Sequence, residues 1–332
     1  MQMQSEQALP QGAENRLAFL SLVESDMQEV ERVLTGTLRE DNPLVQSVAD
    51  YLLGASGKRL RPAMVILAGQ FGTHRRGLTA LAAAVEMIHM ATLVHDDIID
   101  HALVRRGQPA VHVRFNEQVA VLSGDFLFAR AFQLFSDSGD LRVVRAAADV
   151  VHTMCTGEIA QNLDQGRVAS EEGYLQRIYA KTAAFLETAC RIGALGAGAS
   201  PEVGDTLAAY GYALGMAFQI VDDLLDWVAD PERLGKSVGE DLQEGIFTLP
   251  VIYALNNPLS RDALLAVLGA EPGPGTTDQV RTILQSSGAI DYALEKAGDY
   301  IKEALERVAA LPAGAARTAL ESLARFVLDR DY

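Results

Sequence analysis

Two acidic clusters of identical spacing are the part of this sequence most able to do chemistry. Residues 96–100 read Asp-Asp-Ile-Ile-Asp, and residues 222–226 read Asp-Asp-Leu-Leu-Asp. Positions four apart share a helix face, where like charges repel, and both clusters are expected in C-terminal turns, where the helix dipole disfavours anions. A compensating cation is therefore expected. Mg²⁺ fits, because it binds one or two carboxylates and completes its shell with water and phosphate oxygens. The candidate ligands are Asp96, Asp100, Asp222 and Asp226.

The alternative interpretation is that each cluster is an acidic face exposed to solvent. Charge runs are usually of this kind, but both clusters follow apolar residues, Leu93 and Val94 in one case and Ile220 and Val221 in the other. Two such clusters with the same spacing favour metal binding. A calcium-binding EF-hand is excluded, because neither cluster has the loop pattern or its turn glycine.

Basic residues are scarce, and several of them cluster in patterns that suit phosphate. The chain has 28 Lys and Arg against 44 Asp and Glu. In residues 57–62, Gly-Lys-Arg-Leu-Arg-Pro, the proline suits a first helical position, so Lys58 and Arg61 are expected at a helix N-terminus, a natural anion site. Taken singly, each basic pair is typical of a solvated surface, but beside two metal sites the set indicates a diphosphate substrate. Further candidates are Arg105, Arg106, Lys181, Thr182 and Lys236.

The hydrophobic pattern predicts an all-α, multi-helix bundle. Long segments follow the helical period, and Gly and Pro mark the breaks. Helices are predicted at 17–37, 44–54, 78–100, 117–136, 141–164, 171–193, 201–230, 249–255, 277–311 and 315–328. No linker divides the chain, so we expect a flexible segment at 1–14 and a single all-α domain at 15–332.

Composition excludes several classes of protein. A net charge of −16 argues against nucleic acid as a partner and against docking on anionic lipid. The most apolar stretch, residues 78–94, is interrupted by Glu86 and His89, so we expect no stable membrane insertion. Cys155 and Cys190 do not form a disulfide framework and are expected to be idle thiols. A cytoplasmic protein is predicted.

Several motifs occur together along the chain: GKRLRP from Gly57, EMIHMATLVHDDIID ending at Asp100, RRGQP from Arg105, GDFLFARAF from Gly124, KTA from Lys181, FQIVDDLLD ending at Asp226, and GKSVGEDLQEGIFTLP ending at Pro250. In this order they resemble the trans-isoprenyl diphosphate synthase (polyprenyl synthetase) family, over most of the chain and most specifically as a set. The resemblance implies an all-α bundle around a central cavity, usually a homodimer, that uses Mg²⁺ to condense isopentenyl diphosphate with an allylic diphosphate.

The resemblance also implies roles for individual residues. The four aspartates would hold Mg²⁺ on the allylic diphosphate. Lys58, Arg61, His89 and Arg106 would bind isopentenyl diphosphate; from the residues alone, His89 could equally be a core histidine. Arg105, Lys181 and Lys236 would contact the allylic diphosphate, and Thr182 and Gln219 would lie near the reacting carbons. The family often has a lysine just before its Thr-Leu-Pro run; here Ile246 occupies that neighbourhood, which removes one candidate diphosphate contact.

Product length is predicted from the helix that precedes Asp96. Ala91 lies five residues upstream, about 7.5 Å deeper along the helix axis. Family members with short products tend to carry a bulky aromatic residue at this level, whereas this chain has the small residues Ala91 and Thr92. We therefore expect an open tunnel and a long product, hexaprenyl to decaprenyl. If Ala91 only packs against another helix, a geranylgeranyl or farnesyl product is the alternative.

Two other functions compete with this prediction. A class I terpene cyclase would share the fold and one acidic cluster, but it would not need the basic motifs for isopentenyl diphosphate. A non-catalytic subunit would be expected to have lost an acidic cluster or a basic motif, and this chain retains both. A catalytic subunit that requires a silent partner remains open at this stage.

Overall fold

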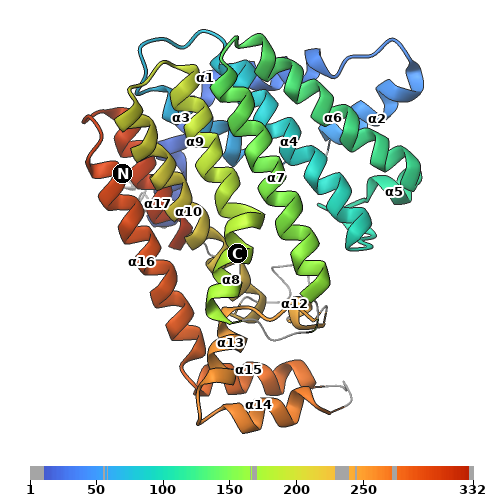
Figure 1. Cartoon of the computed structure of the whole chain (residues 1–332), viewed down its shortest axis with the longest axis vertical. Coiled ribbons are helices and arrows are strands. Elements are labelled where there is room, and N and C mark those ends of the chain that lie inside the picture. The colour runs from blue at the N-terminus through green and yellow to red at the C-terminus, as the bar shows by residue number, and fades with distance from the viewer. Residues whose placement is uncertain are drawn as a thin grey trace, which may run out of the picture.

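The computed structural model describes residues 11–54, 57, 59–164, 166, 170–228, 239–243, 245–270 and 275–328. Nearly all of this is helical (Figure 1). The first half contains α1 (Gln11–Thr37), α2 (Pro43–Gly54), α3 (Leu60–Gly69), α4 (Leu78–Ile99), α5 (Val111–Arg114), α6 (Glu117–Asp137) and α7 (Leu141–Asp164). The second half contains α8 (Glu171–Ile178), the π-helix η1 (Tyr179–Ala183), α9 (Ala184–Gly196), α10 (Pro201–Val228), α12 (Glu240–Gln243), α13 (Leu249–Asn256), α14 (Arg261–Leu268), α15 (Thr276–Ser286), α16 (Ala289–Ala309) and α17 (Ala315–Leu328). The predicted all-α fold is confirmed.

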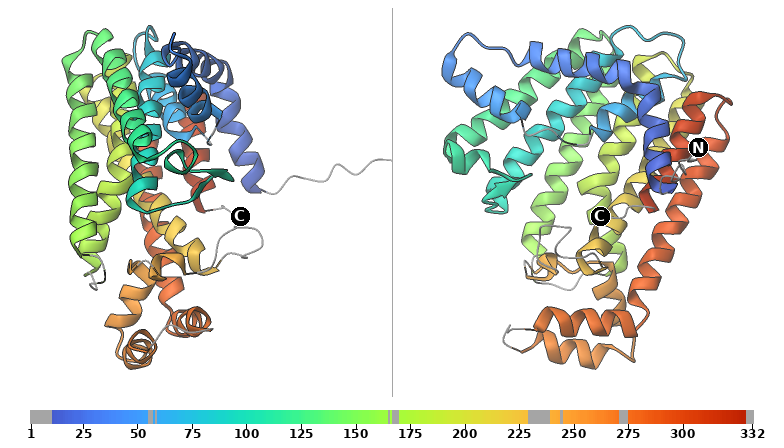
Figure 2. Two further views of the ribbon diagram at one scale, coloured as in Figure 1. Left: turned by 90° about the vertical axis from the view of Figure 1, so that its right-hand side faces the viewer. Right: turned by 180° about the vertical axis from the view of Figure 1, so that it is seen from behind.

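The helices pack as layers around one main apolar core. Helices α6 and α7 form an outer layer, whereas α1 lies on the opposite side of the molecule (Figure 2). Between them α4, α9 and α10 contribute many side chains with no exposed surface. A smaller second core surrounds Trp227 and joins the end of α10 to α13, α14 and α15, which extend from one end of the bundle (Figure 1).

Small residues allow the central helices to approach closely. A Cβ added at Gly215 of α10 would lie 2.5 Å from Cα of Ala183 in η1, and one added at Gly193 of α9 would lie 2.3 Å from the carbonyl oxygen of Val65 in α3. Real Cβ contacts are not this short, so only glycine permits these backbone distances. The Ala- and Gly-rich composition therefore sets how tightly the helices around the acidic clusters pack.

The structure differs from the sequence prediction at several boundaries. The predicted helix 277–311 is two helices, α15 and α16, separated at Gly288, whose φ of 76° only glycine adopts without strain. The helix expected to begin at Pro62 is α3, which begins two residues earlier at Leu60, and α14 was missed. The predicted helix 171–193 contains a π-helical turn, and α1 begins at Gln11, earlier than predicted.

A two-stranded hairpin follows α4 directly. Strand β1 (Val104–Arg105) pairs antiparallel with β2 (Gln108–Pro109). The two residues between the strands, Arg106 and Gly107, have φ values of 52° and 76°, as a two-residue hairpin turn with the right-handed twist of the strands requires. The hairpin therefore places Arg105 and Arg106 beside the end of α4.

Two helices are long and apolar enough to span a membrane by length and composition alone, α4 and α6. In the most apolar stretch of α4, 67% of the residues are buried inside the bundle, as in the core helix of a soluble protein. In the corresponding stretch of α6, 33% are buried. Both cysteines are free; Cys155 is exposed, and burial raises the pKa of the Cys190 thiol.

Candidate active site

Both acidic clusters lie at the C-terminal ends of helices, as predicted. Helix α4 ends at Ile99, and α10 ends at Val228. The middle aspartate of each cluster is buried, with Asp97 2% exposed and Asp223 8% exposed. Asp97 accepts a hydrogen bond from Nε of Arg105 at 2.7 Å. The aspartates at the first and fifth positions of each cluster are more exposed than the aspartate at the second position, and these four are the ones that the sequence singled out.

The buried aspartate of the second cluster orders a chain of hydrogen bonds. Asp223 accepts from the hydroxyl of Tyr174 and from Nε2 of Gln219, each at 2.7 Å. Because its amide nitrogen donates to Asp223, Gln219 turns its Oε1 toward Thr182, whose hydroxyl donates to it at 2.6 Å. Burial raises the pKa of Asp223 to about 6, against the opposing effect of the two hydrogen bonds. Tyr174 and Asp223 thus hold two predicted site residues together.

Lys181 and Thr182 lie on the π-helix η1, which sequence reasoning did not predict. Single π-helical turns inside α-helices are rare and are frequent at functional sites. In η1, Lys181 is exposed and Thr182 is buried. The turn sits close to α7, since a Cβ added at Gly157 would lie 2.4 Å from Cβ of Ala180. This contact holds the backbone of η1 close to α7, one residue before Lys181.

Electrostatics connect the end of α4 to η1 and α7. Burial raises the pKa of Asp96 to about 6, opposed by the positive charge of Lys181 and reinforced by Glu158 and Asp100. Asp96 is thus a carboxylate whose burial is incompletely compensated by the protein. Among the described residues, no three His, Cys, Asp or Glu side chains converge to hold a metal ion by themselves. A Mg²⁺ ion bound by one or two of these carboxylates would therefore need water or phosphate oxygens as further ligands.

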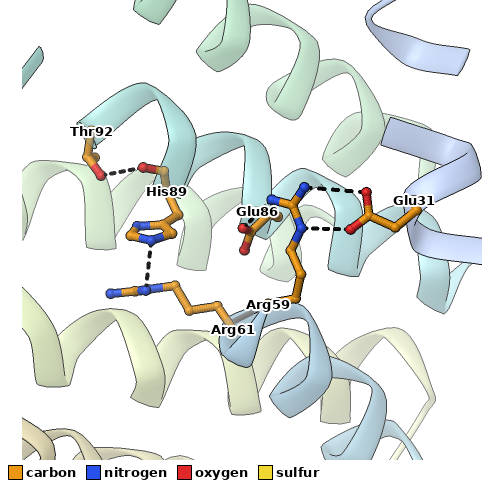
Figure 3. Close-up of polar contacts among 6 residues, drawn as sticks. All are labelled: Glu31, Arg59, Arg61, Glu86, His89 and Thr92. Carbon is orange, nitrogen blue, oxygen red and sulfur yellow. Dashed lines mark hydrogen bonds and ion pairs between the residues drawn. The ribbon is translucent and has the colours of Figure 1, made fainter. Parts of the chain in front are cut away.

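The basic residues gather two helical turns before the acidic cluster. Nη1 of Arg61, from α3, lies 3.0 Å from Nε2 of His89 on α4 (Figure 3). A guanidinium has no acceptor, so Nε2 of His89 accepts this bond and the proton of its neutral ring is on Nδ1. Burial and the nearby Arg61 and Arg106 lower the pKa of His89 well below its usual value. The structure therefore brings His89 into the basic cluster.

The arrangement leaves donors for an anion. The Nε group of Arg61 is buried and has no hydrogen-bond partner within the described part of the chain. Burial lowers the pKa of Arg61 to about 10. Because this value is still well above 7, the guanidinium stays charged at neutral pH. The guanidinium of Arg106 lies against Gly57, where an added Cβ would be 2.6 Å from its Nη1. A bound diphosphate is the kind of group that this desolvated charge and free donor fit.

Two charged residues next to this cluster, Glu86 and Arg59, were assigned no role from the sequence. Glu86, 2% exposed, lies one turn before His89 on α4 and faces the guanidinium groups of Arg59, Arg61 and Arg106. Arg59 binds Glu86 and, from the other side, Glu31 of α1 (Figure 3). The available signal was a lone glutamate inside an apolar helix, which sequence reasoning used only as an argument against a membrane span.

The remaining predicted residues are placed as follows. Ala91 has no exposed surface and belongs to the main core, and the hydroxyl of Thr92 donates to the carbonyl oxygen of His89 at 2.9 Å. Ile246 is half-buried, and its amide donates to the carbonyl oxygen of Asp241 at 2.8 Å. Lys58 and Lys236 lie outside the described residues.

Comparison with known proteins supplies the family. Residues 42–286 match the family described as Polyprenyl synthetase. The chain belongs to the polyprenyl synthetase family. It is a trans-prenyltransferase, and isoprenyl diphosphates are its class of substrate. The resemblance read from the motifs is thereby confirmed, together with the isoprenoid synthase fold.

Individual relatives of this polyprenyl synthetase differ in the product that they are named for. Heptaprenyl diphosphate synthase component 2 of Geobacillus stearothermophilus is 37% identical over 95% of this chain and 99% of its own. Geranylgeranyl diphosphate synthase of Methanosarcina mazei is 38% identical over 85% of this chain and 88% of its own. The crystal structure of polyprenyl synthase from Caulobacter crescentus CB15, complexed with calcium and isoprenyl diphosphate, has a TM-score of 0.87 at 36% identity and covers 95% of this chain and 98% of that one.

Proposed function

We propose that this enzyme condenses isopentenyl diphosphate with an allylic diphosphate, in the presence of Mg²⁺, to make a long-chain all-trans polyprenyl diphosphate. The observation that carries the proposal is the pair of acidic clusters, whose aspartates at positions one and five are less buried than the middle aspartate, in one molecule with a desolvated cluster of arginines. Such a combination suits two diphosphates that are bound in different ways, one through metal ions and the other through guanidinium groups. We further infer that residues 15–332 act as one prenyltransferase domain in the cytoplasm.

The proposed metal ligands are Asp96, Asp100, Asp222 and Asp226, whose oxygen donors suit Mg²⁺. The incompletely compensated charge of Asp96 supports this assignment. Mg²⁺ bound there supplies Lewis-acid assistance to the departure of the allylic diphosphate. The related polyprenyl synthase of Caulobacter crescentus CB15, solved with calcium and isoprenyl diphosphate, supports a divalent ion beside a diphosphate of this class.

The protein's own side chains then bind the substrates and stabilise charge. Arg105, Lys181 and Lys236 contact the allylic diphosphate. The hydroxyl of Thr182 and the carbonyl of Gln219, ordered by their mutual hydrogen bond, present preorganised dipoles to the positive charge that develops on the allylic carbons. As the double bond of isopentenyl diphosphate attacks this carbon, one proton leaves the new chain. We assign that proton to the departing diphosphate, and no side chain to the role of base.

The second substrate occupies the basic cluster. Arg61, His89 and Arg106, with Lys58, bind the diphosphate of isopentenyl diphosphate. While Nε2 of neutral His89 accepts from Arg61, its one N–H is on Nδ1; Nε2 can donate to the ligand only once Arg61 has released it and the ring proton has moved to Nε2. The unpartnered Nε of Arg61 supports this assignment. This site separates the proposal from a class I terpene cyclase, which has no use for a second diphosphate.

Consumption of isopentenyl diphosphate by the purified chain tests the reaction class. With Mg²⁺ and farnesyl diphosphate, labelled isopentenyl diphosphate is expected to enter an acid-labile allylic product, and excess chelator is expected to stop incorporation until Mg²⁺ is restored. Conversion of farnesyl diphosphate alone into a cyclic hydrocarbon, with isopentenyl diphosphate untouched, would instead establish the cyclase.

We also propose that two copies of the chain pair through α6 and α7. These helices form an outer layer (Figure 2), and their solvent side carries large apolar residues that are more than 60% exposed: Leu122, Leu141, Ile159 and Leu163. Large apolar side chains exposed on an outer layer support association at that layer. Light scattering is expected to give twice the chain mass, and Leu122→Glu to lower it to one chain. A monomer that gains activity only with a second polypeptide would favour the alternative of a catalytic subunit with a silent partner.

A further inference from the structure

We propose that Arg59 is a positioning residue that holds the N-terminus of α3, and with it Arg61, in the position that receives the diphosphate of isopentenyl diphosphate. The inference deepens the proposed function and rests on it. Arg59 itself does not contact Arg61 or His89 in the described structure. Its guanidinium points away from them, toward two carboxylates (Figure 3).

The side chain of Arg59 ties three separate elements together. Its Nε and Nη2 donate to the two carboxylate oxygens of Glu31 on α1, at 2.7 and 3.3 Å. Its Nη1 donates to Glu86 on α4 at 2.7 Å. Bidentate contact of this kind fixes direction as well as distance, and it is specific to arginine. With only 11% of its side chain exposed, Arg59 is a tertiary clamp rather than a surface ion pair.

The backbone of Arg59 is also unusual. Its φ of 50° and ψ of 35° lie in the left-handed region, which disfavours residues with a Cβ, and it caps the N-terminus of α3 without a side-chain capping bond. Such conformations persist only where the surroundings enforce them. Glu31 and Glu86 provide that enforcement. Without them the backbone of Arg59 is expected to relax, which moves the N-terminus of α3 and with it Arg61.

Charge explains why this clamp serves the diphosphate site. Glu86 faces three guanidinium groups, those of Arg59, Arg61 and Arg106. Burial lowers the pKa of Arg59, but Glu86 and Glu31 more than offset this and raise it overall. The buried carboxylate of Glu86 therefore attracts all three guanidinium groups, and Arg59 makes a direct hydrogen bond to its Oε1. Glu86 also attracts the guanidinium groups of Arg61 and Arg106, the two arginines assigned to the diphosphate.

Steady-state kinetics of Arg59→Gln test the proposal. The KM for isopentenyl diphosphate is expected to rise about tenfold, the size typical of losing a residue that orients a ligand-binding group, while kcat and the KM for the allylic diphosphate stay within about threefold. Arg59→Lys keeps the charge but cannot contact both carboxylates, so it should recover only part of the loss. Glu31→Gln removes the charge of only the more exposed carboxylate partner of Arg59. This variant is expected to fold and to raise the KM for isopentenyl diphosphate less than Arg59→Gln does.

Calorimetric titration with isopentenyl diphosphate, without metal or allylic substrate, supplies a readout besides turnover. The affinity of Arg59→Gln for isopentenyl diphosphate is expected to fall by about the same factor as its KM rises. The control is Arg317→Gln, which breaks a part-buried ion pair with Glu321 on α17 and is expected to change neither constant. Unchanged affinity and KM in folded Arg59→Gln, or an equal loss in both KM values and kcat, would overturn the positioning role alone. A wild-type chain that never consumes isopentenyl diphosphate would overturn the proposed function, and this proposal with it.

Discussion

At the scale of residues, the three aspartates of each acidic cluster divide into two groups. Successive helical positions differ by about 100° in direction, so the second aspartate cannot share the face of the first and fifth. In this protein it is buried: Asp97 binds Arg105, and Asp223 binds Tyr174 and Gln219. The motif thus encodes both the ligands proposed for the metal and the side chains that orient neighbouring site residues.

This division predicts different effects for neighbouring substitutions. Asp96→Asn is expected to lower kcat by at least about 100-fold, because it removes a proposed Mg²⁺ ligand and with it stabilisation of the leaving group. Asp97→Asn is expected to lower kcat by less than about tenfold and mainly to raise the KM for the allylic diphosphate, because Arg105 loses its partner. Steady-state kinetics at saturating Mg²⁺ measure both. Equal losses in kcat for the two variants would contradict the assignment.

At the scale of elements, the position of the site depends on close helix contacts. Gly215 lets α10 approach η1, and a Cβ there would lie 2.5 Å from the backbone of Ala183. Gly204, on the same helix, has room: an added Cβ would meet only Cβ of Ala194, at 3.8 Å. The two glycines occupy one helix and differ chiefly in the space beside them, so each is a control for the other.

Gly215→Ala is therefore expected to destabilise the fold by about 1–3 kcal/mol through overpacking. Gly204→Ala is expected to stabilise it by up to about 1 kcal/mol, since alanine favours a helix and no neighbour must move. Thermal unfolding followed by circular dichroism gives both values. A stabilising Gly215→Ala would show that α10 and η1 are not held at this distance.

Elements were predictable from the sequence where the helical period is long and unbroken. Helices α4 and α10, which carry the acidic clusters, were located closely because their apolar pattern runs over 22 and 28 residues. The π-helix η1 was missed because it results from packing against α7 and α10, not from local composition. Tyr174 was missed as a partner of Asp223 for the same reason, since 49 residues separate them in the chain.

At the scale of the whole molecule, the length of the product depends on how far the chain can grow from the acidic clusters into the bundle. Ala91 lies about 7.5 Å from Asp96 along the axis of α4. Ala91 is fully buried in the main core. If the growing chain passes this face of α4, Ala91→Phe is expected to shorten the product, because the ring would fill part of its path, and Ala91→Leu is expected to give an intermediate length. Chromatography of the dephosphorylated products measures both, with the KM for isopentenyl diphosphate as a check that the site is intact. An unchanged product distribution would remove Ala91 from the control of length.

The measurement that tests the central claim most directly is the product made by the purified chain alone. The chain would be incubated with Mg²⁺, labelled isopentenyl diphosphate and farnesyl diphosphate, and the products dephosphorylated and sized. We predict polyprenols of hexaprenyl length or longer. A short product would retain the reaction but contradict the long-chain assignment, and a folded, metal-supplied chain that incorporates no label would contradict the claim that this chain carries out the condensation by itself.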